Sequence, residues 1–141
     1  CAAESVLVQL LLHYADLSNC TKPFRICRIW AWQVLEEFFA QGDEELTIGL
    51  PVQALNDREK VNKPFSQVGF IEFLVSPLLF AVMKVLPPTV PCAQQMVSNT
   101  KMWHHIWLTE SKKTPEESEQ RALAERVAKL EKRYEDSKPV T

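Results

Sequence analysis

Asp16 is the first residue whose type and setting point to chemistry. It lies in the segment HYADLSN (13–19), at the end of an apolar run that has helical periodicity. A carboxylate among apolar residues is costly unless its charge is compensated. A divalent cation can compensate it, because carboxylate oxygen binds both Mg²⁺ and Zn²⁺. One carboxylate makes no metal site, however, and from spacing alone a helix-ending Asp bonded to the backbone of a turn is the simpler interpretation.

The histidines add no obvious metal or catalytic cluster. They are His13, His104 and His105. The last two are sequence neighbours and point to different sides of a helix, so we expect them to have structural roles.

The four cysteines show no CxxC pair and no regular spacing, so we expect reduced thiols in an intracellular, cytoplasmic protein. A disulfide between Cys20 and Cys27 would require the local backbone to bring them together. Any association with a membrane would involve regions outside this sequence. The cysteines are Cys1, Cys20, Cys27 and Cys92.

The composition favours one folded domain. Of 141 residues, 46% are hydrophobic and only 3 are Gly, which argues against disorder. A net charge of -2 gives no general attraction to nucleic acid or anionic membranes. The apolar stretch 70–86 contains Glu72, Pro77 and Lys84. It is also shorter than a membrane-spanning helix, which needs about 20 apolar residues, so we expect a buried core helix. Because the sequence begins without Met or a basic leader, we expect it to be part of a longer polypeptide.

Helical periodicity predicts an all-α fold. A first helix should end near Ser18, and Thr21 should cap a second helix that runs to about Ala40 and is closed by Gly42. The core-facing residues expected on the first helix are Val6, Leu10, Tyr14 and Leu17, and those on the second are Ile26, Trp30, Val34, Leu35 and Phe38.

The second half should contain an ordered loop and three more helices. Residues 49–64 have no sustained period, and a loop this long is often functional. A third helix is expected from Ser66 to about Val85, bent at Pro77, and a fourth over 93–109. The apolar residues expected on the fourth helix are Met96, Trp103, Ile106 and Trp107.

The last segment predicts a narrow amphipathic helix. Residues 114–117 (TPEE) form a potential capping box with Pro at the first helical position. An apolar seam follows, which can pack on the parent domain or form a coiled coil with a homodimer partner or another docking partner. We therefore divide the chain into 1–110 and a C-terminal helix and tail at 111–141. The seam consists of Leu123, Val127, Leu130 and Tyr134.

Three blocks of sequence resemble the C-terminal half of class I cyclic nucleotide phosphodiesterase catalytic domains. The first runs from HYADLSN (13–19) through TKP (21–23) and Trp30 to EEFF and QGD (36–43). The second is GLPV (49–52) with NDR (56–58), and the third is SQVGFI (66–71). Their order and spacing are family-like. The resemblance implies a compact multi-helix catalytic domain, of which this sequence is the C-terminal portion only.

The resemblance also implies a metal site and a reaction. Asp16 matches the family's C-terminal metal-ligating aspartate, in a binuclear site that holds Zn²⁺ and Mg²⁺ (or Mn²⁺). Hydroxide activated by the two metals would attack phosphorus and hydrolyse 3′,5′-cyclic nucleotides (cAMP, cGMP or both) to 5′-monophosphates.

The resemblance also implies a purine pocket of six residues, with Gln67 at its centre. That residue matches the family's purine-binding glutamine, whose amide offers an acceptor and a donor side by side. Phe70 lies three residues later on the same helical face and can stack on the base, opposite Val34. Further positions that match the pocket lining are Leu17, Asn19 and Phe38. Without the resemblance, Gln67 would be read as a polar residue at a helix start and Phe70 as a core aromatic.

Departures from the family bear on selectivity and activity. Cys20 replaces a common Pro, and Trp32 stands at a position that is commonly polar. Cys27 stands where several cAMP-selective members have a Tyr that can bond the glutamine, so the amide of Gln67 is less constrained.

The remaining metal ligands and the general-acid histidine belong to an N-terminal half that this sequence does not contain. We therefore expect the segment alone to be inactive and to have that half as its partner. The alternative is a truncated or degenerate phosphodiesterase half that acts as a protein-interaction module. The joint presence of Asp16, Asn19, Gln67 and Phe70 favours the enzyme.

Overall fold

The computed structural model describes residues 2–111 and 113–139, with side chains from Glu4 onward, and every regular element in that part is a helix or helical turn. The all-α prediction is therefore confirmed. The elements in chain order are α1 (Ala2–Asp16), the 3₁₀ turn η1 (Ser18–Thr21), α2 (Phe24–Thr47), α3 (Lys63–Phe70), the π-helical turn η2 (Ile71–Val75), α4 (Ser76–Val85), the 3₁₀ turn η3 (Pro87–Thr89), α5 (Val90–Glu110) and α6 (Glu117–Ser137).

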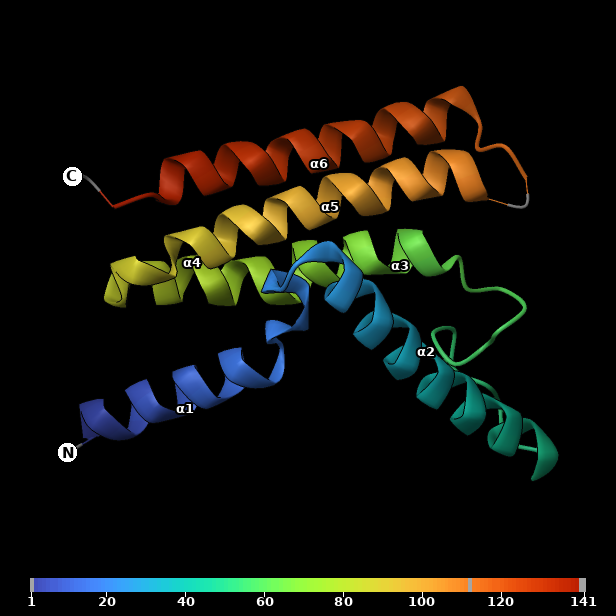
Figure 1. Cartoon of the computed structure of the whole chain (residues 1–141). Coiled ribbons are helices and arrows are strands. Elements are labelled where there is room, and N and C mark those ends of the chain that lie inside the picture. The colour runs from blue at the N-terminus through green and yellow to red at the C-terminus, as the bar shows by residue number, and fades with distance from the viewer. Residues whose placement is uncertain (1, 112, 140–141) are drawn as a thin grey trace.

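Helix α5 is the element around which the others gather. In Figure 1 it lies between α6 and the continuous run α3–η2–α4. Helices α1 and α2 diverge from the η1 turn, α1 running beside α4 and α2 extending away toward the loop that leads to α3. Contacts of α5 with η1, α3, α4 and α6 join the two ends of the chain into one core.

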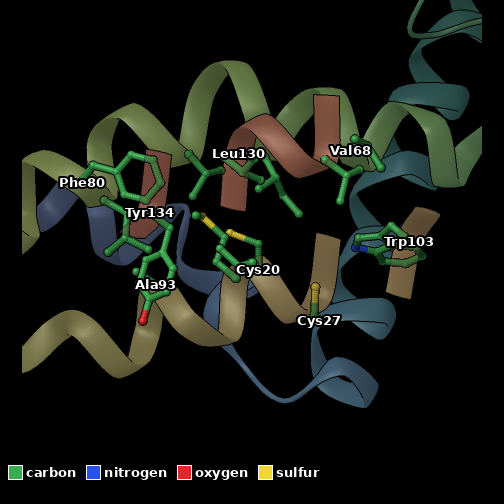
Figure 2. Packing of buried hydrophobic residues seen from close by; sticks show 14 of the residues in the cluster. Cys20, Cys27, Val68, Phe80, Ala93, Trp103, Leu130 and Tyr134 are labelled. Atoms are coloured by element: carbon green, nitrogen blue, oxygen red, sulfur yellow. The ribbon is translucent and has the colours of Figure 1, made fainter. Parts of the chain in front are cut away.

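The core is apolar and contains the residues predicted on α5. Met96, Trp103, Ile106 and Trp107 are all buried. The indole of Trp103 stacks on Trp32 at a centroid distance of 5.1 Å. Figure 2 shows the cluster extending from Trp103 at one end to Phe80 and Tyr134 at the other.

The run Lys63–Val85 is the central helix of this core. By length and composition alone it could cross a membrane, but 44% of its most apolar stretch is buried inside the chain, which agrees with the predicted core helix. It starts at Lys63 rather than Ser66, because Asn62 caps it by accepting a 3.1 Å hydrogen bond from the Phe65 amide. The irregularity lies in η2, just before Pro77, since proline has no N–H to donate to the carbonyl four residues earlier.

The predicted inner face of α2 is wrong by one residue. Leu35 is buried, but Ile26, Trp30, Val34 and Phe38 are 39–53% exposed. Four of the five buried positions come one residue after these, and the small side chains among the five allow close packing. The five positions are Cys27, Ala31, Leu35, Phe39 and Gly42.

Both predicted ends of α2 also differ from the structure. The Thr21 hydroxyl donates to the Ser18 carbonyl at 2.8 Å within η1 and does not cap α2, whose N-cap is Pro23. At the other end the helix continues through Gly42 to Thr47, and Gly49 then adopts a φ of 77°. Gly42 serves a close approach instead, because a Cβ there would collide with the backbone carbonyl of Asn56 and lie 2.8 Å from its carbon.

Helix α6 packs on its own chain. All four seam residues are buried in the common core with α4 and α5, which is the parent-domain alternative. The capping box forms at Glu116 and Glu119, two residues later than predicted, with the Glu116 amide donating to Glu119 Oε2 at 2.9 Å. A glutamate carboxylate here takes the acceptor role that was expected of Thr114.

On the first helix, Val6 is 64% exposed, whereas Leu10, Tyr14 and Leu17 pack against the core as predicted. Cys20, Cys27 and Cys92 are free thiols, as expected, and Cys1 lies outside the described residues.

Substitution of Gly42 tests the close approach. In the full polypeptide that carries this chain, Gly42→Ala should cost roughly 1–3 kcal/mol, because the Asn56 backbone must move. The measurements are the thermal midpoint and hydrogen-exchange protection of residues 49–62. Gly69→Ala is the matched control: the nearest atom to its new Cβ is 3.9 Å away, and alanine favours a helix. Equal stability of the two variants would contradict the packing described here.

Candidate functional site

The turn that carries Asp16 and Asn19 is held by one buried amide. Asn99, in the middle of α5, is fully buried and donates from Nδ2 to the carbonyls of Cys20 at 2.7 Å and Lys22 at 2.8 Å. Its Oδ1 accepts from Gln95 Nε2 at 2.9 Å. Every hydrogen-bonding atom of the Asn99 side chain is thus engaged, and the turn between α1 and α2 is tied to the centre of the core.

Asp16 is the last residue of α1 and is exposed. Within the described part of the chain, its carboxylate makes no hydrogen bond or ion pair, so the interpretation of a carboxylate bonded to turn backbone is not supported. Free carbonyls at a helix C-terminus add negative potential that favours a cation. Nevertheless, no group of three His, Cys, Asp or Glu side chains that could hold a metal occurs among the described residues. Asp16 therefore fits a metal site as a single ligand.

Gln67 and Phe70 lie on α3, as predicted, three residues apart on one helical face. Gln67 is 8% exposed, and in the described residues its amide makes no side-chain hydrogen bond, so both its donor and its acceptor are available. Phe70 is partly buried against the core.

Val34 and Phe38 lie one turn apart on α2 and are each 39% exposed. The turn η1 and the helix α3 both contact α2 and α5, so the elements that carry the predicted site residues are neighbours. No side-chain hydrogen bond or ion pair joins any two of the seven predicted site residues in the described part of the chain. These residues therefore lie on neighbouring elements but are not linked to one another by polar contacts.

The loop after α2 is fastened to that helix by two of the conspicuous sequence blocks. Asn56 Nδ2 donates to both carboxylate oxygens of Glu45 at 3.3 Å. Arg58 Nη2 pairs with Asp43 at 2.6 Å and its Nη1 with Glu36 at 3.2 Å. Hydrogen bonds from Arg58 hold the pKa of the Asp43 carboxyl below its usual range. The QGD block (41–43) and the NDR block (56–58) therefore meet in space, which brings the chain back to the start of α3.

Lys63 continues this fastening at the first residue of α3. Its Nζ pairs with Glu36 Oε1 at 2.7 Å and lies 5.5 Å from the ring centroid of Trp32. Helices α2 and α3 are consequently joined close to where α3 presents Gln67.

Burial changes the pKa of two thiols and one histidine, and none of the three belongs to a catalytic cluster within the described residues. Burial is the main cause that raises the pKa of Cys27 to about 11 and that of Cys20 to about 12, so both are neutral thiols near pH 7. Burial also lowers the pKa of His104, with a contribution from His105, and its ring stacks on Trp107. The stacking and partial burial of His104 agree with a structural role for this histidine, and the role expected of His105 stays a prediction.

Asn99 is the residue of the site region that sequence reasoning missed. The available signal was its register, because Asn99 lies three residues after Met96 and four before Trp103, on the apolar face of a predicted core helix. A buried polar group of this kind requires partners, although the sequence does not identify them.

The chain matches known proteins over most of its length. A profile for 3′5′-cyclic nucleotide phosphodiesterases matches residues 2–100. The probable 3′,5′-cyclic-AMP phosphodiesterase pde-4 of Caenorhabditis elegans is 32% identical over 108 residues, which are 77% of this chain and 16% of that protein. The high affinity cGMP-specific 3′,5′-cyclic phosphodiesterase 9A of Homo sapiens is 39% identical over 83 residues, or 59% of this chain and 14% of that protein.

A similar relative and a similar structure complete this comparison. The dual specificity calcium/calmodulin-dependent 3′,5′-cyclic nucleotide phosphodiesterase 1B of Bos taurus is 40% identical over 87 residues, or 62% of this chain and 16% of that protein. The solved structure of LmjPDEB1 in complex with IBMX matches with a TM-score of 0.65 and 36% identity, over 69% of this chain and 30% of that chain. The chain thus spans about a sixth of the length of the curated relatives it matches.

Replacing Asn99 tests the anchoring of the turn. In the full polypeptide, Asn99→Leu should lower stability by about 2–4 kcal/mol, because two backbone carbonyls lose their donor. Hydrogen exchange should show the loss of protection first at residues 17–24. Ser98→Leu, a change at the neighbouring exposed position, is the control and should stay within about 0.5 kcal/mol. Unchanged protection in Asn99→Leu would show that the turn does not depend on this amide.

Proposed function

This chain belongs to the 3′,5′-cyclic nucleotide phosphodiesterase family, and we propose that it contributes a purine pocket and one metal ligand to hydrolysis of cAMP, cGMP or both to 5′-monophosphates. The observation that carries the proposal is the common attachment of the Asp16 turn and of the Gln67 helix to α5. The names of the three curated relatives above specify cAMP, cGMP and dual specificity for 3′,5′-cyclic nucleotides, respectively.

In the proposed pocket, Gln67 recognises the purine edge and the apolar residues hold its faces. A side-chain amide can pair with adenine in one orientation and with guanine in the flipped one. Phe70 would stack on one face of the base and Val34 would contact the other, with Phe38, Leu17 and Asn19 completing the lining. The exposure of Val34 and Phe38 supports this role, since these side chains remain available for contact.

The pocket should accept both bases. Gln67 has no side-chain hydrogen-bond partner in the described residues, and Cys27, where a Tyr could orient the amide, is a fully buried thiol. A thiol is a weak donor, so nothing near this position is expected to hold the amide in one orientation. We infer dual specificity for the full polypeptide.

Asp16 would hold one metal of a binuclear Zn²⁺ and Mg²⁺ (or Mn²⁺) site, and the remaining ligands and the general acid would come from outside this chain. Such ions, when bound, lower the pKa of a water nucleophile and offset charge on phosphoryl oxygens. The contribution of this chain is to place the carboxylate, through the turn that Asn99 anchors, near the pocket that receives the base. The segment alone would therefore be inactive.

The exposed apolar side chains suggest where the rest of the catalytic domain packs. On α1, Val8 and Leu12 are 55% and 66% exposed, and on α2 Ile29 and Trp30 are 50% and 53% exposed. Exposed apolar side chains that lie together on a helix usually mark an interface. We propose that helices from outside this chain cover it and close the catalytic site.

Hydrolysis assays on two site variants of the full, metal-loaded polypeptide test the proposal. Asp16→Ala should lower kcat by at least about 100-fold, because a metal ligand is lost. Gln67→Ala should raise KM by roughly 10- to 100-fold for both nucleotides, because a paired hydrogen bond to the base is lost.

Matched controls for these variants lie elsewhere on the surface. Asp136→Ala removes an exposed carboxylate from α6, and Gln94→Ala removes an exposed amide from α5. Both should retain the wild-type constants. Hydrolysis that survives Asp16→Ala, or a well-folded polypeptide that hydrolyses neither nucleotide, would contradict the proposed function.

A further inference from the structure

Arg126 on α6 contacts the helix that carries the proposed purine-binding residues. Its Nε donates to Glu72 Oε2 at 2.7 Å, and its Nη2 lies 2.7 Å from the same oxygen. The guanidinium also lies 5.4 Å from the ring centroids of both Phe65 and Phe73. One side chain of α6 thus contacts α3 and η2 at three positions.

This ion pair is the most sheltered one among the described residues. The side chains of Arg126 and Glu72 are 28% and 14% exposed, whereas every other ion pair recorded there has at least one partner that is more than a third exposed. Solvent screens a sheltered pair less, so it constrains the geometry of the two helices more strongly than a surface pair does.

The contacts of Arg126 lie before and after Gln67 and Phe70, on the other side of the helix. Successive residues advance by about 100° around a helix, so Phe65 and Glu72 share one face while Gln67 and Phe70 point roughly the opposite way. A Cβ at Gly69 would be 3.9 Å from Arg126 Nη2, which places the guanidinium over this face.

Glu72 lies in the π-helical turn η2, which directly follows Phe70. A π turn inserts one extra residue per turn and so changes the rotational phase between the segments on its two sides. Holding Glu72 therefore fixes how α3, and with it Gln67, is rotated relative to α4, which is anchored in the core. Arg126 supplies that hold from a helix that lies beyond the family match at residues 2–100.

We propose that Arg126 is a positioning residue for the purine pocket: through Glu72 and the two phenylalanine rings, α6 sets the rotation of α3 and hence the direction of Gln67 and Phe70. The inference rests on the proposed function. Arg126 itself would touch neither the nucleotide nor the metal site, because it lies on the far face of the helix. Loss of the contact should weaken recognition of the base and spare the chemical step.

Steady-state kinetics of the full, metal-loaded polypeptide test this, with cAMP and cGMP as substrates. Arg126→Gln should raise KM for both nucleotides roughly tenfold, with kcat within about threefold of wild type, because a coupling between helices is lost while the Asp16 turn is untouched. Glu72→Gln should reproduce the effect, and the double variant should be no worse than either single variant. Arg126→Lys, which keeps a cation, should recover most of the loss.

Lys101→Gln is the matched control. It breaks the 2.6 Å ion pair between Lys101 and Glu131, whose side chains are about half exposed. Like the Arg126 pair, this pair attaches α6 to the rest of the chain, but it does so at α5 and not at α3 or η2. Hydrogen exchange should show faster exchange at residues 67–75 in Arg126→Gln and not in Lys101→Gln. Should Arg126→Gln fail to fold, Glu72→Gln gives the same KM comparison.

The two possible failures are distinguishable. If wild type hydrolyses cyclic nucleotides but Arg126→Gln and Glu72→Gln match Lys101→Gln in KM, the positioning role is wrong and the proposed function stands. A fall in kcat at unchanged KM would also overturn it. A wild-type polypeptide that hydrolyses neither nucleotide removes the proposed function, and the positioning role with it.

Discussion

The hydrogen bonds of Asn99 are the constraint on which the arrangement of the site depends. The α1–α2 connection must present Asp16 and Asn19 at the surface, yet it crosses an apolar core in which backbone carbonyls need donors. One amide on α5 serves the carbonyls of Cys20 and Lys22. Because α5 also packs against α3, the same helix fixes the position of the Asp16 turn relative to the helix that carries Gln67.

A second constraint is the return of the chain from α2 to α3. Gly42 lets the loop approach the helix, Asn56 and Arg58 attach it, and Lys63 starts α3 against Glu36. Polar residues that look like separate motifs in the sequence thus serve one purpose, which is to bring Gln67 back beside α2. The hold of Arg126 on Glu72 would act on the same helix from the opposite face.

Much of this was predictable from sequence, because the information is local. Helical periodicity predicts α5 and the seam of α6, and the three family-like blocks predict membership of the family. The inner face of α2 was not predictable, since the bulky stripe through Trp30 and Val34 looks like a core face and only the packing of Cys27 and Ala31 shows otherwise. The backbone partners of Asn99 lie 77 and 79 residues away in the chain and the partner of Arg126 lies 54 residues away, so no local pattern reveals them.

The most direct test is a crystal structure of the full polypeptide with Zn²⁺, Mg²⁺ and 5′-AMP or 5′-GMP. We expect a metal ion on the Asp16 carboxylate. We also expect the purine to pair with the Gln67 amide and to stack on Phe70, with different amide orientations for the two nucleotides. A nucleotide bound away from Gln67, or a metal centre in which Asp16 takes no part, would contradict the proposed function.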